Sequence, residues 1–233
     1  MAAAGQSSAV DAFLEALGSG TEQLEGIALE TDDREVVLRD CVRVGCALTA
    51  AKALQSLEVE LCQTELCTAF AEALKNNASI RKLSLHLRGR HFGDEAGVAL
   101  AAALEKKRSL QSFTLKATGT QLGNETGVAL AAALEKNSSL RSFTLEAAAH
   151  LGNKASVALA AALEKNSSLQ SFALEARYRR QLGNEASAAF VRALEANVTL
   201  QSFTMPCDVL LDDNDAAFAA CIARNHQLRR QRH

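Results

Sequence analysis

Apolar residues return along this chain in a short pattern, apolar-x-x-apolar-x-apolar, that is typical of a brief strand. One copy reads Leu140-Arg-Ser-Phe-Thr-Leu145. The copies begin at Leu24, Leu54, Ile80, Leu110, Leu140, Leu169 and Leu200, at intervals of 30, 26, 30, 30, 29 and 31 residues. Self-similarity at a nearly fixed period indicates a repeat protein, so the chain is predicted to stack similar units one on another.

A helical pattern precedes each predicted strand. In residues 122–137 it reads Leu-Gly-Asn-Glu-Thr-Gly-Val-Ala-Leu-Ala-Ala-Ala-Leu-Glu-Lys-Asn, in which Leu130 and Leu134 share one helix face. Gly-Asp or Gly-Asn opens each later helix, and its polar side chain is predicted to accept a hydrogen bond from the first turn of its own helix. These side chains belong to Asp94, Asn124, Asn153 and Asn184. A unit of one helix and one strand cannot bury its own apolar face, so the units must stack.

All 233 residues are predicted to form one domain. Residues 1–23 hold an N-terminal capping helix, because Val10 to Leu17 has helical spacing. Residues 24–205 hold about seven repeats, and residues 206–233 form a C-terminal helical cap and a basic tail.

The repeated unit resembles the ribonuclease-inhibitor type of leucine-rich repeat, as found in the repeat regions of NOD-like receptors. It is also similar to the repeats of Ran GTPase-activating protein and of tropomodulin. The residues that carry the resemblance are Leu122-Gly-Asn-Glu-Thr-Gly-Val-Ala-Leu-Ala-Ala-Ala-Leu-Glu-Lys-Asn-Ser-Ser-Leu140. The resemblance implies an α/β fold, a right-handed leucine-rich-repeat solenoid shaped as a short horseshoe. Its parallel sheet would line the concave face and its helices the convex face.

One feature departs from that family. The usual repeat carries Asn or Cys a few residues after the last strand leucine, where the side chain satisfies backbone groups in the turn. The corresponding segment here reads Lys116-Ala-Thr-Gly-Thr-Gln121. We therefore expect no ladder of asparagines, and other groups must satisfy the turns.

Composition narrows the classes of function. With 25 basic and 27 acidic residues, the chain has no general attraction for nucleic acid or for an anionic membrane. It shows neither a signal-peptide pattern nor an apolar run long enough to span a bilayer, which favours a cytoplasmic monomer. The six cysteines form no C-x-x-C pair, and the five histidines share no ligand spacing. We expect reduced thiols, no metal and no cofactor.

Five Asn-x-Ser/Thr triplets occur, at Asn77, Asn124, Asn137, Asn166 and Asn197. One interpretation is a glycosylated, secreted protein. The other is turn chemistry that spells the same triplet, because Asn readily bonds to nearby backbone groups in turns. The missing signal peptide favours turn chemistry.

The predicted concave face carries rows of serine and threonine without a partnered histidine or lysine, which is not a catalytic arrangement. We therefore predict no enzymatic activity, and a protein–protein interaction scaffold for a partner that the sequence does not identify. Two alternatives follow from the resemblance: a regulator of an enzyme, such as a GTPase-activating protein, and a protein that binds actin-filament ends. A further alternative is that the chain is one fragment of a longer repeat array, or a member of an expanded repeat family with no dedicated partner.

The candidate partner-binding residues lie in variable loops and in one mixed row of the sheet, because variation on a regular scaffold is where recognition usually lies. A loop with tyrosine among arginines has the make-up of an interface hot spot. The plain alternative is a set of solvated loops. The candidates are Arg177, Tyr178, Arg179 and Arg180 in one loop, Arg88 and Arg90 in another, and Lys116, Glu146 and Glu175 in the row.

Overall fold

The computed structural model describes residues 9–29, 34–147, 151–176, 184–205 and 220–225. Its helices are α1 (Ala9–Gly18), α2 (Arg34–Ala50), α3 (Thr64–Asn76), α4 (Asp94–Lys106), α5 (Asn124–Lys136), α6 (Asn153–Lys165) and α7 (Asn184–Ala196). Its strands are β1 (Gln23–Leu29), β2 (Ser56–Leu61), β3 (Lys82–Arg88), β4 (Ser112–Thr118), β5 (Ser142–Ala147), β6 (Ser171–Ala176) and β7 (Ser202–Thr204). Residues 220–225 are helical as well.

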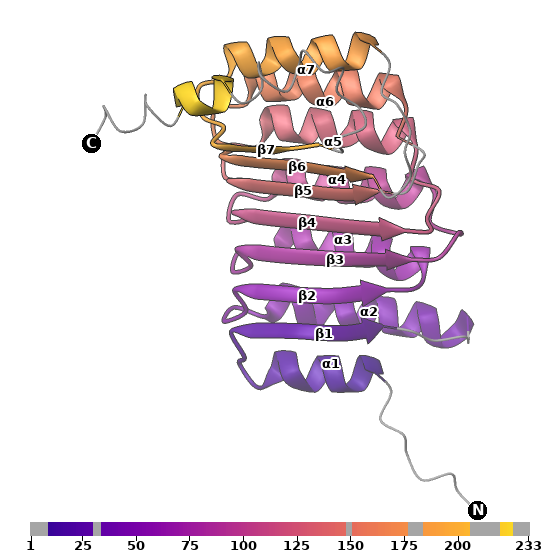
Figure 1. Cartoon of the computed structure of the whole chain (residues 1–233). Coiled ribbons are helices and arrows are strands. Elements are labelled where there is room, and N and C mark those ends of the chain that lie inside the picture. Colours follow the sequence, from indigo (N-terminus) through magenta and orange to yellow (C-terminus); the bar gives the residue numbers. More distant parts are fainter. Residues whose placement is uncertain (1–8, 30–33, 148–150, 177–183, 206–219, 226–233) are drawn as a thin grey trace, which may run out of the picture.

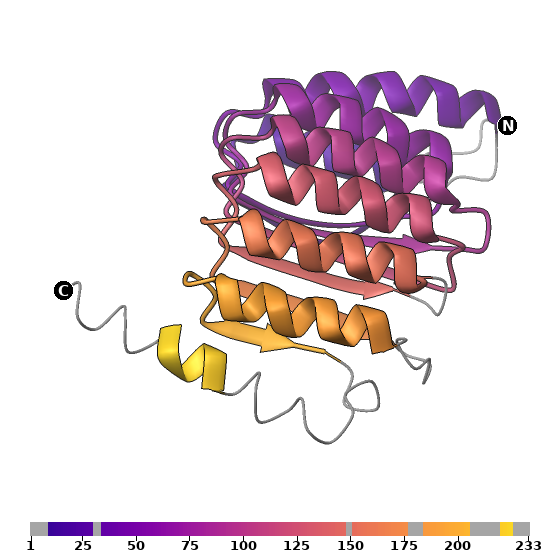
Figure 2. The ribbon, with the colours of Figure 1, turned by 90° about the horizontal axis from the view of Figure 1, so that it is seen from above.

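The strands form one parallel sheet in chain order, β1 to β7. Figures 1 and 2 show all the labelled helices in a single layer behind this sheet, whose other face no described element covers. Parallel neighbours need a crossover connection, and each helix supplies it. The predicted fold is confirmed: a right-handed solenoid of helix–strand units with a continuous parallel sheet.

The strands begin later than the sequence pattern predicts. From β2 onward, the first apolar residue of each pattern lies in the turn, two residues before its strand. Residues three apart on a strand point to opposite faces, so a strand could not bury both Leu110 and Phe113. The turn allows both side chains to reach the core, and both are fully buried. The prediction of a strand was therefore wrong at the first position of the pattern.

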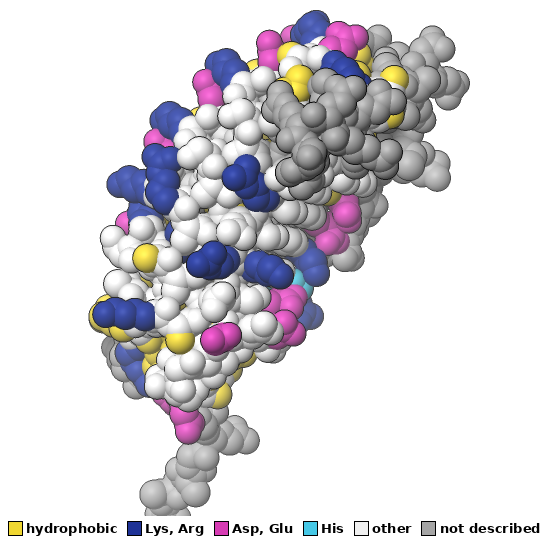
Figure 3. Space-filling view, turned by 90° about the vertical axis from the view of Figure 1, so that its left-hand side faces the viewer, with side chains coloured by type: hydrophobic (Ala, Val, Ile, Leu, Met, Phe, Trp, Pro, Cys, Tyr) yellow, Lys and Arg dark blue, Asp and Glu magenta, His cyan; other side chains and the backbone are white. Residues whose placement is uncertain are grey.

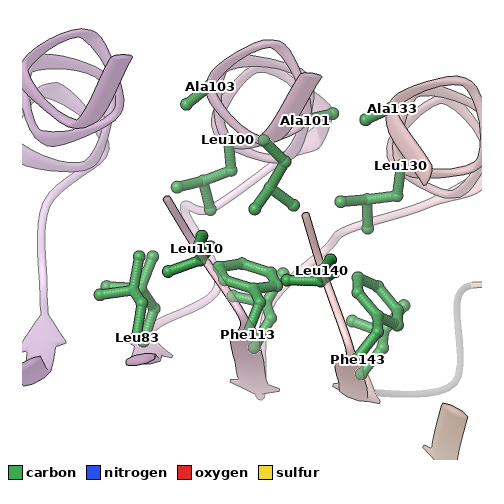
Figure 4. Packing of buried hydrophobic residues seen from close by; sticks show 14 of the residues in the cluster. Leu83, Leu100, Ala101, Ala103, Leu110, Phe113, Leu130, Ala133, Leu140 and Phe143 are labelled. Atoms are coloured by element: carbon green, nitrogen blue, oxygen red, sulfur yellow. The ribbon is translucent and has the colours of Figure 1, made fainter. Parts of the chain in front are cut away.

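The core lies between the sheet and the helices. Figure 4 shows Leu100 and Leu130 pointing down from their helices toward Phe113 and Phe143 on the strands. Exact register brings Phe113, Phe143, Phe172 and Phe203 into one row. Their ring centroids are 6.0, 5.7 and 5.8 Å apart in turn, a separation at which aromatic rings attract one another.

Small side chains let neighbouring helices touch. A Cβ atom added to Gly97 of α4 would come within 2.2 Å of Thr126 of α5. One added to Gly127 would come within 2.3 Å of the Cβ of Ala155 in α6. The helices are thus in contact at these positions, which explains why the helix bodies are built of alanine and glycine.

Buried asparagines connect each unit to the one before it. The side chains of Asn77, Asn137, Asn166, Asn197 and Asn225, hereafter the asparagine ladder, are each at most 4% exposed. The Nδ2 of Asn137 donates to the carbonyl oxygens of Leu104 and Lys107 at 2.6 and 2.9 Å. Its Oδ1 accepts from the amides of Ser139 and Leu140, both at 2.9 Å.

The sequence predicts no asparagine ladder after the strands, and none of these residues lies there. Their ladder lies at the turn from helix to strand, a device that the sequence analysis did not foresee. The same geometry supports turn chemistry for four of the Asn-x-Ser/Thr triplets, because the amide nitrogens of Asn77, Asn137, Asn166 and Asn197 all donate to backbone carbonyls.

Lys107 occupies the ladder position of the fourth unit. Its side chain is buried, and its Nζ donates to the carbonyl and the side-chain oxygens of Asn77. Burial lowers the pKa of Lys107 from 10.5 to about 8. A lysine has no acceptor to offer the amides of Ser109 and Leu110, which an asparagine would bond.

At Asp94 and Asn124, the polar residue at the helix start caps the next helix, not its own. Asp94 is the first residue of α4, yet its Oδ1 accepts from the amides of Gly123 and Thr126 at 2.7 and 2.9 Å, at the start of α5. Asn124 accepts likewise from Gly152 and Ala155. The N-cap residues are Gly93, Gly123 and Gly152, which have no side chain that could cap their own helix. The prediction of capping within one helix was wrong at Asp94 and Asn124, where adjacent units share their caps, and it stays a prediction at Asn153 and Asn184.

The helical residues 220–225 close the stack at its C-terminal end. The guanidinium of Arg224 donates to the carbonyls of Leu194 and Asn197 at 3.0 and 2.9 Å. Asn225 donates to the carbonyls of Asn197 and Leu200. These bonds continue the asparagine ladder by one step, from the turn after α7 to residues 220–225. The predicted domain boundaries remain predictions.

A first prediction tests the two faces of the sheet. Leu145 is 1% exposed, so Leu145→Asp would bury an unpaired charge and lower the free energy of unfolding by about 3–5 kcal/mol. Ser142 lies on the open face of the same strand, and Ser142→Asp should cost less than about 1 kcal/mol. Urea unfolding followed by circular dichroism measures both values. Equal losses for the two variants would contradict the assigned faces.

A second prediction concerns Lys107. Its pKa is about 8 in the folded state and 10.5 ordinarily, so between those values the unfolded chain holds a proton that the folded chain has released. The free energy of unfolding of the wild type should therefore rise with pH across this window, while below pH 8 the full cost of the buried charge remains. Lys107→Asn restores the ladder and should stabilise the protein by about 1–3 kcal/mol at pH 7.

The measurement is the difference in urea stability between wild type and Lys107→Asn, taken from pH 7 to pH 10. Other lysines titrate equally in both proteins, so they cancel in the difference. The stabilising effect should shrink as pH rises above 8. A difference that stays constant with pH would contradict a depressed pKa at this position.

Candidate interaction surface

The open face of the sheet presents three rows of side chains, because each strand points alternate residues outward. Strand register places Ser112, Ser142, Ser171 and Ser202 in one row. Thr114, Thr144, Ala173 and Thr204 form the second row. Glu60, His86, Lys116, Glu146 and Glu175 form the third. This surface is half-exposed, regular and polar, with small hydroxyl side chains over β4 to β7.

The structure brings together three of the candidate residues from the sequence. Lys116, Glu146 and Glu175 lie at the same register on β4, β5 and β6, so they are neighbours along the third row. Arg88 lies at the end of β3, where its Nη1 pairs with Glu60 at 3.3 Å. Arg90 is exposed in the turn beyond β3 and lies outside the row. Partner binding by these five residues stays a prediction.

The remaining candidates, Arg177, Tyr178, Arg179 and Arg180, lie outside the residues that the structure describes. The loop that contains them therefore cannot be placed relative to the third row, and its role also stays a prediction.

Sequence reasoning missed a contact between a carboxylate and a histidine on this face. Glu58 Oε1 lies 3.0 Å from Nε2 of His86 on the neighbouring strand. Ser84 Oγ lies 3.4 Å from the same nitrogen. Strand register places Glu58 beside Ser84, so Glu58 and His86 are diagonal neighbours on adjacent strands, a separation that long side chains can bridge.

A serine, a histidine and a carboxylate so close together raise the question of catalysis. In a catalytic triad the serine bonds to one ring nitrogen and the carboxylate to the other, so that the imidazole relays a proton. Here both Ser84 and Glu58 approach Nε2 of His86. The group is therefore a surface contact of Glu58 and Ser84 with one ring nitrogen, with no relay through the ring.

The thiols are free wherever the structure describes them. Cys67 is buried, and desolvation raises its pKa to about 12, which makes it unreactive. Cys41 and Cys46 line an open groove of about 580 Å³ between α2 and α3, on the helical side of the molecule. Among the described cysteines, Cys67 and Cys221 are buried, Cys41 and Cys62 are half-buried and Cys46 is exposed, while Cys207 lies outside the described residues.

Among the described residues, no three side chains of His, Cys, Asp or Glu gather closely enough to hold a metal ion. None of the described helices combines the length and the apolar character needed to cross a membrane.

Comparison with known proteins supports the fold. No protein-family model matches the sequence, and no curated protein matches it. A solved structure of leiomodin-1, its actin-binding site 2, is similar over 70% of this chain and 90% of that chain, with 21% identity and a TM-score of 0.57. The C-terminal domain of tropomodulin from Caenorhabditis elegans is similar over 83% of this chain and 97% of that chain, with 17% identity and a TM-score of 0.53. The chain therefore shares the leucine-rich-repeat-like architecture of these domains.

Proposed function

We propose that this protein is a non-catalytic scaffold that binds a protein partner through the open face of its sheet. The observation that carries the proposal is the continuous seven-stranded parallel sheet whose outward face no described element covers. Such a face is stiff, because every strand is bonded to its neighbours and anchored by a helix. A stiff surface loses little conformational entropy when a partner binds.

The third row is the part of this face with the most specific chemistry. Lys116 is flanked by His86 on one side and Glu146 on the other, so the sign of charge changes along the row. A pattern of alternating charge selects among partners through electrostatic complementarity, whereas the serine row offers only small hydrogen-bonding groups.

A charge swap within the row tests this proposal. In Lys116→Glu with Glu146→Lys the net charge is unchanged, so long-range steering is preserved while the local pattern is reversed. Proteins that the wild type captures from cell lysate are titrated against both forms. The swap should weaken their affinity about tenfold or more.

The matched control is a swap on the helical face, Arg192→Glu with Glu195→Arg, since both residues are exposed on α7. Partners should bind this control as they bind the wild type. A partner that tolerates both swaps equally would remove the third row from the interface.

Actin is a second candidate partner, favoured by the structural likeness to actin-binding site 2 of leiomodin-1. A protein that binds filament ends slows elongation of pyrene-labelled actin at concentrations far below that of the monomer. That is the expected result for this candidate. Elongation that is unchanged at equimolar protein would remove it, and the scaffold proposal would then rest on other partners.

A further inference from the structure

From α2 onward, the turns that lead from helix to strand carry basic side chains and no acidic ones, whereas the turn after α1 holds the exposed Glu22. The turns after α2 to α7, residues 51–55, 77–81, 107–111, 137–141, 166–170 and 197–201, contain no Asp or Glu. The exposed basic side chains of these turns, together with Lys82 at the start of β3, are hereafter called the basic edge. They belong to Lys52, Arg81, Lys82, Arg108 and Arg141. The whole chain has a net charge of −2, so this segregation is opposite to its overall balance.

Figure 3 faces this edge. Dark-blue side chains stand there on white turn surface, between a column of mixed charges on the left and a magenta group on the right. Acidic side chains border the edge on both sides, and Glu22, in the turn before β1, lies at its N-terminal end, where its carbonyl accepts from the amide of Gln55.

Strand register brings the basic side chains close together. Lys82, Ser112 and Ser142 align on β3, β4 and β5, so Arg81 and Arg141, which precede the first and the last, lie two strands apart. At ~4.8 Å per strand this separation is ~10 Å between backbones, and Arg108 comes from the turn between them. One short ligand can therefore reach all three guanidinium groups.

Two of the arginines are held along the edge. Arg141 Nη1 donates to the carbonyl of Ser168 in the following turn at 2.9 Å. Arg108 Nη1 reaches Ser138 Oγ at 3.5 Å, a longer and weaker contact. A guanidinium has five N–H donors, so one bond orients it and leaves the others for a ligand.

None of the five basic side chains pairs with an acid within the described residues. By contrast, nearby lysines of the helices are paired: Lys136 with Glu105 and Lys165 with Glu135, each at 2.9 Å. The charges of the basic edge are therefore available to an external anion.

The fold itself does not require these cations. Basic residues stabilise helix C-termini only within about the last turn. Arg81 and Arg141 lie five residues beyond the ends of α3 and α5. Other side chains bond the carbonyls at those helix ends: Asn166 donates to the carbonyl of Leu134 in α5 at 2.5 Å, and Lys107 donates to the carbonyl of Asn77 just after α3.

We propose that the basic edge binds an acidic peptide segment of a protein partner. The proposal rests on the proposed scaffold function but adds a second surface, at the strand starts of β3 to β5. Guanidinium groups bind carboxylates through paired, charge-assisted hydrogen bonds. Acids border the edge on both sides, Glu58 and Glu60 on the sheet and Glu105 and Glu135 on the helices. An extended peptide can follow the line of turns between these acids, and competition with RNA distinguishes it from a polynucleotide.

The test uses a fluorescein-labelled peptide of ten glutamates and fluorescence anisotropy at low ionic strength, with a peptide of ten glutamines as the neutral probe. Wild-type protein should bind the acidic peptide saturably and the neutral one not at all. Arg108→Glu with Arg141→Glu should weaken binding about tenfold or more, and added salt should weaken binding to the wild type.

A matched control separates a local site from overall charge. Lys154→Glu with Arg192→Glu changes the net charge by the same amount, at two exposed positions on α6 and α7. Its affinity for the acidic peptide should stay within about twofold of wild type, because distant exposed charges are screened by salt.

Three results would overturn the proposal: no binding of the acidic peptide, equal weakening by the two double variants, or displacement of the peptide by a ten-nucleotide single-stranded RNA at lower concentration than by unlabelled acidic peptide. If the arginine double variant melts at lower temperature, Arg81→Glu replaces it, since that side chain makes no hydrogen bond or ion pair among the described residues. Undiminished binding in Arg81→Glu would then refute the site. Because the probe is a synthetic peptide, none of these results depends on whether a partner binds the open face of the sheet.

Discussion

The buried asparagine amide is the interaction on which the rest of this structure depends. One side chain satisfies two carbonyls of the preceding unit and two amides of its own turn, as at Asn137. Leaving such buried groups without partners costs roughly 1–3 kcal/mol for each. The ladder therefore sets where each helix ends, where each strand begins and how far apart the units lie. The exact strand register follows, and so do the row of phenylalanine rings and the rows of side chains on the open face.

The opposite edge of the solenoid is held by a related device. Asp94 and Asn124 each cap the helix of the following unit, so helix starts are also satisfied between units. For Asp94, burial by itself raises the pKa, but the bonds from the Thr126 hydroxyl and from nearby amides outweigh burial and lower it. Both edges thus place their strongest polar contacts between neighbours. Such contacts stiffen the stack and leave the outward face of the sheet available for binding.

This division of labour explains why candidate binding groups can vary without loss of the fold. The ladder, the shared caps and the apolar rows lie inside, while the third row and the basic edge lie outside and contribute little to packing. Likeness to leiomodin and tropomodulin domains at 21% and 17% identity is consistent with this, because the architecture persists when most side chains differ. Function on such a scaffold is decided by the outward residues.

The sequence by itself determined the number of units, the α/β class and the apolar core, because hydrophobic period and helix propensity are local properties. It also determined which residues share a row, since a constant period of about thirty residues puts equal positions side by side. Only the tertiary structure decided where the polar side chains bond. The cap of Asp94, the partners of Asn137 and the pairing of Glu58 with His86 all reach into a neighbouring unit, about thirty residues away along the chain. A pattern within one unit predicts bonds within that unit, so these contacts, and the basic edge that gathers from four turns, became visible only when the units were stacked.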